Sequence, residues 1–446
     1  MIVNRHKLER FHSDRSSRLI LSTFEVALES VRPEQLVKRA VKLDNRQLIV
    51  RDIYGKVARL PEFDHVYLVG AGKAVAGMAC ALCSILRNRV VAGAITVPYG
   101  TKAEIKGILV THASHPIPNN AGIQGTKNIL SILKRADHND LVIVLISGGG
   151  SALMPLPASG VSLTDKQRIT DMLLRSGANI HEINVVRKHL SAVKGGQLLR
   201  YMNESCNVVS LILSDVIGDD LGIIASGPTY PDSSTFRDAL KILRKYRVDP
   251  QDAASKLIAE GLKGKIEETP KPQDRVFTRI HNMLIGNNAI ACRAAACYLK
   301  RRGVKAVHLG SEFDGEAKEF GAFLARLTLG FGRTRFAIVA GGETTVKLEK
   351  RKDGLGGRNQ EAALACLARL ERQDVAVGCL GTDGIDGNSD AAGALISPKT
   401  IMLAKKMDLQ RYLDMHDSYH ALKKLHSLIF TGYTGTNVND ISICMS

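Results

Sequence analysis

The sequence predicts an α/β protein with two domains. Short apolar or β-branched runs alternate with longer segments of helical periodicity, a pattern typical of βαβ units around a parallel sheet. The chain has 446 residues, more than one hydrophobic core usually organises, and its 45% hydrophobic and 24% charged residues are typical of globular proteins. Glycines and polar residues also collect where the predicted strands end, and open α/β sheets bind ligands at these ends.

The first series of predicted elements begins with an amphipathic helix over residues 19–31. Its strands are expected over residues 65–69, 141–146 and 208–213, the first of them followed by an Ala-rich helix that ends near residue 87. Residues 164–167 predict a capping box that opens another helix, which Gly177 closes.

Residues 261–281 are rich in Lys, Glu and Pro and lack sustained periodicity, which predicts a linker or an exposed connection. A second series follows it. Its strands are expected over residues 282–285, 306–309, 337–340 and 375–378, and its helices over 289–301, 316–329 and 360–369. We therefore place an N-terminal domain at residues 1–270 and a C-terminal domain at 275–446.

The net charge of +17, from 61 Lys and Arg against 44 Asp and Glu, is scattered along the sequence. Aromatic residues make up only 5% and Trp is absent, so there is little material for stacking nucleic-acid bases. The apolar runs are too short to cross a bilayer. We expect neither nucleic acid nor a membrane as a partner.

Eight cysteines without a secretory signal favour a reducing compartment. The basic residues between Arg5 and Arg18 resemble a mitochondrial transit peptide, but Glu9 and Asp14 break the acid-poor character of such peptides. We expect a cytoplasmic protein, with a mitochondrial location as the alternative.

The first predicted strand ends in Gly70-Ala71-Gly72-Lys73. A dinucleotide fingerprint would need a third glycine at Val75, and a P-loop would need a hydroxyl in place of Ala74. A lysine at the start of a helix can still neutralise a phosphate or carboxylate together with the free N–H groups of that helix. A surface lysine after a tight turn explains the pattern equally well.

The second strand ends in Ser147, Gly148, Gly149, Gly150 and Ser151. Three consecutive glycines allow backbone N–H groups to converge on an anion, which bulkier residues would prevent. A flexible connector is the alternative, but the run directly follows a buried strand, so we favour a phosphate-binding nest.

A third group of polar residues surrounds the strand at 208–213. Arg187, Ser191 and Lys194 would share one face of a helix over 183–194, as a binding stripe or as solvated cations. Residues 214–220 carry three carboxylates, which could hold a metal or accept a proton from a substrate hydroxyl, with turn and cap chemistry as the alternative. Asp215, nearest the strand, is the candidate for the functional one.

Two further motifs lie in the C-terminal half. The loop at 381–390 contains Asp383 and Asp386, which could coordinate Mg²⁺ loosely, although Asx turns explain it about as well. Gly356-Gly357-Arg358-Asn359-Gln360-Glu361 is, taken alone, a glycine turn that leads into a helix with a polar first turn.

Taken together and in order, these motifs resemble the glycerate kinases of the MOFRL type, the class II enzymes that make 2-phosphoglycerate. The resemblance covers nearly the whole chain. Its matching runs are residues 70–73, 115–118, 147–153, 186–190 with 194–196, 214–220 with 226–229, 341–344, 356–361, 381–386 and 435–440. The sequence departs from the family at Asn119, where an Asp is expected.

The resemblance implies a Rossmann-like N-terminal domain with a mostly parallel sheet, a smaller C-terminal α/β domain (the MOFRL domain), and an active site in the cleft between them. It implies phosphorylation of D-glycerate by ATP with Mg²⁺, in a monomer or homodimer. The alternatives are an NAD(P)H-dependent hydroxypyruvate reductase and an inactive metabolite-binding protein.

The resemblance also implies roles for single residues. Lys73 and Arg358 would neutralise the glycerate carboxylate and the phosphoryl group in transfer, and Asp215 would orient or deprotonate the attacking hydroxyl. Ser147 to Ser151 would hold the nucleotide phosphates. The remaining substrate contacts would come from Arg187, Lys194, Asn359 and Glu361. Arg358 is expected to reach toward Lys73 and Asp215.

Overall fold

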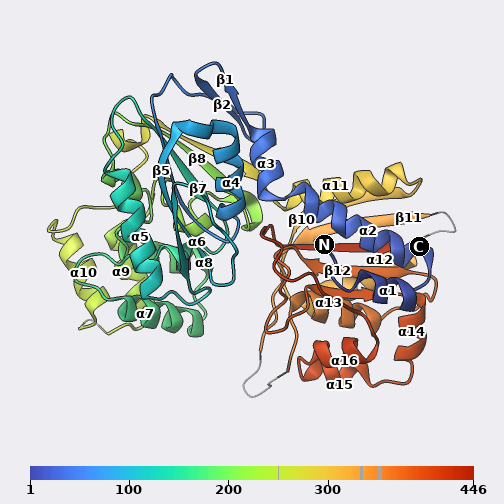
Figure 1. Ribbon diagram of the computed structural model, residues 1–446. Helices are drawn as coiled ribbons and strands as arrows, with labels where there is room; N and C mark the ends of the chain where they lie inside the picture. Colours follow the sequence, from blue (N-terminus) through green and yellow to red (C-terminus); the bar gives the residue numbers. More distant parts are fainter. Residues whose placement is uncertain (250, 332–334, 349–353) are drawn as a thin grey trace. The chain divides into compact units, whose positions relative to one another are not determined.

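The computed structural model describes residues 1–446 except 250, 332–334 and 349–353. The chain forms two compact units (Figure 1). The first unit is Pro33–Gly286, and the second unit combines Met1–Arg32 with Asn287–Ser446. These limits differ from the predicted domains 1–270 and 275–446, because the first 32 residues fold with the C-terminal half and because the strand at 280–286 belongs to the first sheet.

The first unit contains a six-stranded sheet in the order β6-β5-β4-β7-β8-β9, in which every neighbouring pair is parallel. Its strands are β4 (Val66–Ala71), β5 (Val90–Pro98), β6 (Ile108–Ala113), β7 (Leu141–Ile146), β8 (Asn207–Leu213) and β9 (Ile280–Gly286). Every residue of β4 and β7 is buried, which explains their continuous apolar sequences. The expectation of a Rossmann-like, parallel sheet is confirmed, but the strand predicted at 282–285 belongs here and not to the second unit.

The strand order places a topological switch point between β4 and β7. From β4 the chain proceeds outward through β5 to β6, and it then crosses back to continue from β7 through β8 to β9. The connections after β4 and β6 therefore run in opposite directions, and right-handed crossovers place their helices on opposite faces of the sheet. A crevice opens at the carboxyl ends of the strands where such a reversal occurs, and this is where doubly wound sheets bind ligands.

The first unit is completed by helices and by a three-stranded antiparallel sheet. The small sheet is formed by β1 (Val41–Asp44), β2 (Gln47–Arg51) and β3 (Val57–Arg59). The helices are α3 (Pro33–Ala40), α4 (Val75–Leu86), α5 (Asn120–Leu133), α6 (Gly150–Leu153), α7 (Leu163–Arg175), α8 (Ile180–His189), α9 (Phe236–Lys245) and α10 (Ala253–Leu262). Asn119 caps α5 by accepting from the Gly122 N–H at 3.2 Å, a task that Asn and Asp perform equally well.

The second unit has a mixed six-stranded sheet in the order β10-β11-β15-β12-β13-β14. Its strands are β10 (Lys305–Phe313), β11 (Phe336–Gly342), β12 (Ala376–Gly381), β13 (Gly393–Ile396), β14 (Leu428–Ile429) and β15 (Asp440–Met445). Only β10 and β11 pair in parallel, whereas the C-terminal strand β15 runs antiparallel between β11 and β12. The sheet is therefore less parallel than the alternating pattern of the sequence predicts.

Helices cover both faces of this second sheet. They are α1 (Arg5–Phe11), α2 (Arg15–Ser30), α11 (Asn288–Arg301), α12 (Ala317–Leu329), α13 (Arg358–Leu367), α14 (Pro398–Ala404), α15 (Leu409–Asp414) and α16 (Ser418–Lys424). Val377 and Cys379 of β12 face the core formed with α12, α13 and α16. The intervening Gly378 faces Ile20 and Phe24 of α2, so α2 lies on the opposite face.

The N-terminal helices are part of this core although they are far from it in sequence. Ile20, Leu21 and Phe24 of α2 are completely buried, and the dark blue α1 and α2 lie among the orange and red elements of the second unit in Figure 1. The basic residues that resemble a transit peptide thus belong to folded helices.

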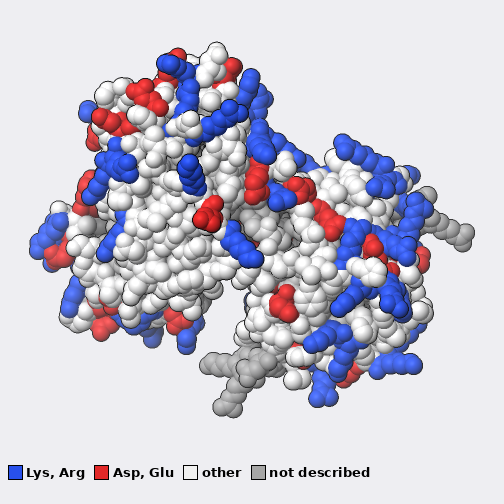
Figure 2. Space-filling model, viewed as in Figure 1, with Lys and Arg blue, Asp and Glu red and all other residues white. Residues whose placement is uncertain are grey.

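Charged side chains are dispersed on the surface. On the face shown in Figure 2, Lys and Arg are spread over both units with Asp and Glu among them, in keeping with the scattered charge of the sequence. Among the described residues, no helix is long and apolar enough to cross a membrane.

Candidate active site

Three of the predicted motifs meet at the switch point of the first sheet. β4, β7 and β8 are neighbours, and their carboxyl ends lead into Lys73, the glycine nest and Asp215, respectively. Parallel strands end on the same edge, so the fold brings these motifs together although they are spread over more than a hundred residues of sequence. The sequence singles out these three motifs as candidates, and the strand order makes the strand ends that carry them adjacent.

Lys73 lies beside the glycine nest. Its backbone N–H donates to the Gly148 carbonyl at 2.9 Å, and Ala74 N–H donates to Ser147 Oγ at 3.0 Å. A side chain at Gly149 would meet Cγ of Lys73 at 3.4 Å. Ser147 is completely buried, so its hydroxyl fixes the start of α4 and does not face a ligand.

The nest itself depends on glycine. Gly149 has φ of +81° and stands at the N-terminus of the short helix α6, in the left-handed region that favours glycine. A Cβ at this position would also lie 2.9 Å from the imidazole ring of His115. Gly149 and Ser151 are half-buried, which leaves this part of the nest within reach of a ligand.

The predicted cationic stripe is wrong in its secondary structure. Helix α8 ends at His189, and Ser191 pairs instead with Pro157 as an isolated bridge, so Lys194 lies on a loop beyond the helix. Arg187 remains on the helix and is half-buried, whereas Lys194 is only 2% exposed. Lys194 Nζ donates to the Ala225 carbonyl at 3.3 Å.

Lys166 joins these two cations, and sequence reasoning did not identify it. It stands on α7, is 8% exposed, and donates to the Pro155 carbonyl at 2.9 Å. Burial, together with the charge of Arg187, lowers the pKa of Lys166 to about 7. In the sequence, Lys166 lies within the capping box predicted over residues 164–167. The structure places the capping box at Ser162 and Asp165 instead.

The carboxylates after β8 divide into two kinds. Asp219 accepts from the Tyr54 hydroxyl at 2.8 Å, which ties it to the connection between β2 and β3, whereas Asp220 accepts from the Gly222 N–H at 2.8 Å within its own turn. Asp215 is half-buried directly beyond the end of the strand. Its position agrees with its choice as the candidate to contact a substrate hydroxyl.

In the second unit, Arg358 begins α13 and lies within a carboxylate cluster. It donates from Nε to Asp440 Oδ2 at 2.6 Å, from NH2 to Asp440 Oδ1 at 3.2 Å, and from NH1 to Glu343 Oε1 at 2.7 Å. Burial alone would lower the pKa of Arg358, but attraction to Asp440 and Glu343 outweighs it and raises that pKa. Burial raises the pKa of Asp440 to about 7.

Asn359 and Glu361 are buried and are bonded to other side chains of the second unit. Asn359 Nδ2 donates to Asp440 Oδ1 at 2.9 Å, and Glu361 lies 3.0 Å from His416 Nδ1. Both side chains are less than 5% exposed. These contacts favour a positioning role for the two residues over the direct substrate contact predicted for them.

Asp386 does not have the geometry of a metal ligand. Its Oδ1 accepts from Asn359 N and Nδ2, and its Oδ2 accepts from Gln360 N and Nε2, at 2.8–3.2 Å. The carboxylate thereby caps α13. Asp383 Oδ1 accepts from Ile385 N–H, as in an Asx turn. In the part of the chain that the structure describes, no three His, Cys, Asp or Glu side chains are grouped to hold a metal.

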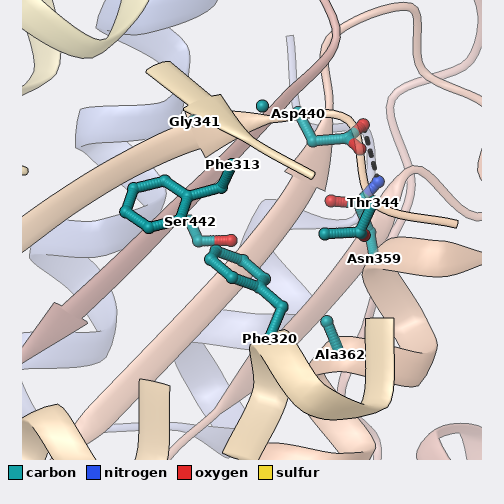
Figure 3. Close-up of a pocket in the computed structure, with 9 residues that line it drawn as sticks. Phe313, Phe320, Gly341, Thr344, Asn359, Ala362, Asp440 and Ser442 are labelled. Carbon is teal, nitrogen blue, oxygen red and sulfur yellow. Dashed lines mark hydrogen bonds between the residues drawn. The ribbon is translucent and has the colours of Figure 1, made fainter. Parts of the chain in front are cut away.

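A small cavity lies beside this cluster (Figure 3). It measures about 10 Å³, and the ring of Phe320 and the side chains of Thr344 and Ser442 line it near the bonded pair Asn359 and Asp440. This volume suits a single water molecule. Neither glycerate nor a nucleotide fits inside it.

Comparison with known proteins identifies the family of the chain. A family model described as a domain of unknown function (DUF4147) matches residues 19–259, and the model of the MOFRL family matches residues 336–440. Glycerate 2-kinase of Pyrococcus horikoshii is 43% identical over 94% of both chains, and D-glycerate 2-kinase of Thermotoga maritima is 40% identical over 92% of this chain and 98% of its own. Two Agrobacterium vitis relatives, 39% and 38% identical over 84% of this chain, carry provisional names as hydroxypyruvate reductases.

A solved structure shares the fold. The crystal structure of glycerate kinase from Thermotoga maritima superimposes with a TM-score of 0.82 at 37% identity, covering 96% of this chain and 99% of the other. Sequence similarity of this extent, with the same fold throughout, shows common descent. The chain belongs to the MOFRL-type glycerate kinase family.

Proposed function

We propose that this protein phosphorylates the 2-hydroxyl group of D-glycerate with ATP, giving 2-phosphoglycerate and ADP. The family membership and the names of the relatives support the reaction. The observation that carries it in this chain is the meeting of Lys73 with the glycine nest at the switch point of a Rossmann-like sheet. A cation beside converging N–H groups is suited to a nucleotide phosphate.

Phosphoryl transfer depends mainly on positioning and on neutralising charge. In this mechanism the nest holds the phosphates of ATP, and the ammonium group of Lys73 offsets the negative charge of the phosphoryl group as it moves. Asp215 accepts a hydrogen bond from the glycerate hydroxyl and orients it for attack. These roles explain why the reactive residues lie at strand ends, where the sheet holds their backbone rigidly.

Arg358 would bind the phosphoryl group or the glycerate carboxylate, as the resemblance to the family implies. A guanidinium carries five N–H donors, and the bonds to Asp440 and Glu343 use one on each of its three nitrogens. One N–H therefore remains on each terminal nitrogen for a ligand. The side chain is 30% exposed, so a phosphoryl or carboxylate oxygen can reach it.

Mg²⁺ would enter as the complex with ATP. Asp386 is occupied as a helix cap, so the pair Asp383 and Asp386 does not fit a metal site, and no step of the mechanism is assigned to residues that hold the ion. The ion would neutralise phosphate charge as part of the substrate.

The test is a coupled assay of ADP release from the purified protein with D-glycerate and MgATP, followed by NMR of the product. We expect ADP release and 2-phosphoglycerate. Absence of ADP release would contradict the proposal, and 3-phosphoglycerate would contradict the choice of hydroxyl.

The alternative activity, reduction of hydroxypyruvate by NAD(P)H, is tested by following nicotinamide absorbance with hydroxypyruvate. The site does not favour it, because Val75 occupies the place of the third glycine in a dinucleotide fingerprint. In the structure Val75 is completely buried at the first position of α4. We expect no oxidation of the nicotinamide.

A further inference from the structure

Three basic side chains of the first unit, two of them buried and one half-buried, lie near one another without an acidic partner. They are Lys166 of α7, Arg187 of α8 and Lys194 of the following loop, called the cation cluster below. None of them forms an ion pair with a carboxylate among the residues that the structure describes. Each is close enough to another for the positive charges to repel.

Such an arrangement costs free energy in the absence of a ligand. Burial lowers the pKa of Lys194 well below its ordinary value, with further lowering by Lys166 and Arg187, and burial also lowers the pKa of Arg187. A charged group removed from water normally requires an opposite charge or several hydrogen bonds. The bonds found for the two lysines are single ones to backbone carbonyls, at 2.9 and 3.3 Å.

The cation cluster adjoins the glycine nest. Lys194 contacts Ala225, and the next residue, Ser226, shares a hydrogen bond of 2.8 Å with Ser151 of the nest. Ser226 Oγ also donates to Asn184 at 2.8 Å, and Asn184 lies one helical turn before Arg187 on α8. A chain of hydroxyl and amide groups thus connects the cluster to the end of the nest.

We infer that Lys166, Arg187 and Lys194 form an oxyanion subsite beside the nest, in which the carboxylate of glycerate or a phosphate group of the nucleotide supplies the missing negative charge. This inference rests on the proposed function for the identity of the ligand. It adds Lys166 to the site and assigns both buried lysines to the binding of an anion.

Two independent measurements, melting temperature and ligand affinity, distinguish an anion-binding cluster from a purely structural one. Methionine at position 166 keeps the length of the side chain and removes its charge. If the cluster exists to bind an anion, Lys166→Met relieves repulsion, and the melting temperature without ligand stays the same or rises. The same change removes a charged hydrogen-bond donor from the ligand, so affinity falls about 10- to 100-fold.

The experiment measures binding by calorimetry for the wild type, Lys166→Met, Lys194→Met and the control Arg175→Met. Arg175 lies on the same helix, α7, but is 80% exposed and pairs with Asp171, so the control removes one charge outside the cluster. The probes are D-glycerate, ADP and inorganic phosphate, each added alone. Loss of affinity for D-glycerate assigns the subsite to the carboxylate, and loss for ADP assigns it to the nucleotide.

Unchanged affinity for all three probes in both cluster variants would overturn the inference, and so would a lower melting temperature with unchanged affinity. Failure of the proposed function gives a different result. If the wild-type protein binds phosphate through the cluster but releases no ADP, the subsite is supported and the kinase activity is contradicted.

Discussion

Replacement of Arg358 by alanine is expected to destabilise the second unit by an amount that grows with pH. Arg358 is bonded to Asp440 at 2.6 Å, and burial raises the pKa of Asp440 to about 7. An opposite charge at such a distance lowers a carboxyl pKa by about 1–3 units. Removal of the guanidinium should therefore raise the pKa of Asp440 further by the same amount.

The sign follows from the folded and unfolded pKa values of Asp440. In the unfolded chain this carboxyl titrates near its ordinary 3.8, below its folded pKa of about 7. Its contribution to stability therefore falls as the pH rises from about 4 to about 7 and is level above that in the wild type. In the variant the fall continues beyond pH 7 up to the raised pKa of Asp440, so at about 1.4 kcal/mol per unit the full additional loss is about 1.4–4 kcal/mol. At about pH 9, two units above the wild-type pKa, the loss is about 1.4–2.8 kcal/mol.

The assay is urea unfolding followed by circular dichroism at about pH 6 and about pH 9. Wild type and Arg358→Ala are each compared in the presence and absence of Asp440→Asn, which removes the titrating group. A loss that is equal at both pH values, or greater at about pH 6, would refute the reasoning. The catalytic role of Arg358 is best measured near pH 6.5, where we expect the fold to contribute least to the loss of activity.

Three other changes test separate parts of the structure. Lys73→Ala should reduce kcat for glycerate phosphorylation at least about 100-fold without changing the melting temperature. The control Lys134→Ala, at the other end of the strands, should leave kcat unchanged. Equal rates for both variants would exclude the role of Lys73. Gly149→Ala places a side chain where φ is +81°. We therefore expect about 1–2 kcal/mol lower stability and a higher KM for ATP. Unchanged stability and unchanged KM would contradict the phosphate-binding role of the nest. Deletion of residues 1–32 removes four large apolar side chains of α2 that are at most 1% exposed, namely Ile20, Leu21, Phe24 and Leu28. Their burial is worth roughly 6–12 kcal/mol at about 1.5–3 kcal/mol each. Hydrogen exchange should then show an unprotected second unit, and full protection would contradict the assignment of these residues to its core.

Much of the first sheet follows from its sequence. β7 matches the predicted span 141–146, because a strand buried on both faces needs an unbroken apolar run. The antiparallel strand β15 was not predicted. Its short apolar run at the C-terminus becomes a central strand only by pairing with β11 and β12, which are distant in sequence.

In the candidate site, too, some residues could be predicted from the local sequence and others only from contacts between distant segments. Lys73, the glycine nest and Asp215 were recognisable because their positions after strands carry a local chemical meaning. Lys166 was not, because a lysine on an amphipathic helix is normally solvated, and only the packing of α7 against the loop at Pro155 buries it.

The sequence by itself determined the α/β class, the family and the strand-end motifs, since these depend on local periodicity and on residue types that particular turns require. The tertiary structure decided which strands are neighbours, that residues 1–32 complete the second unit, and that Asp386 caps a helix. The physical reason is that burial and pairing are properties of contacts between distant segments. An aspartate has the same sequence signature whether it holds a metal or a helix N-terminus, and only its neighbours in space distinguish the two.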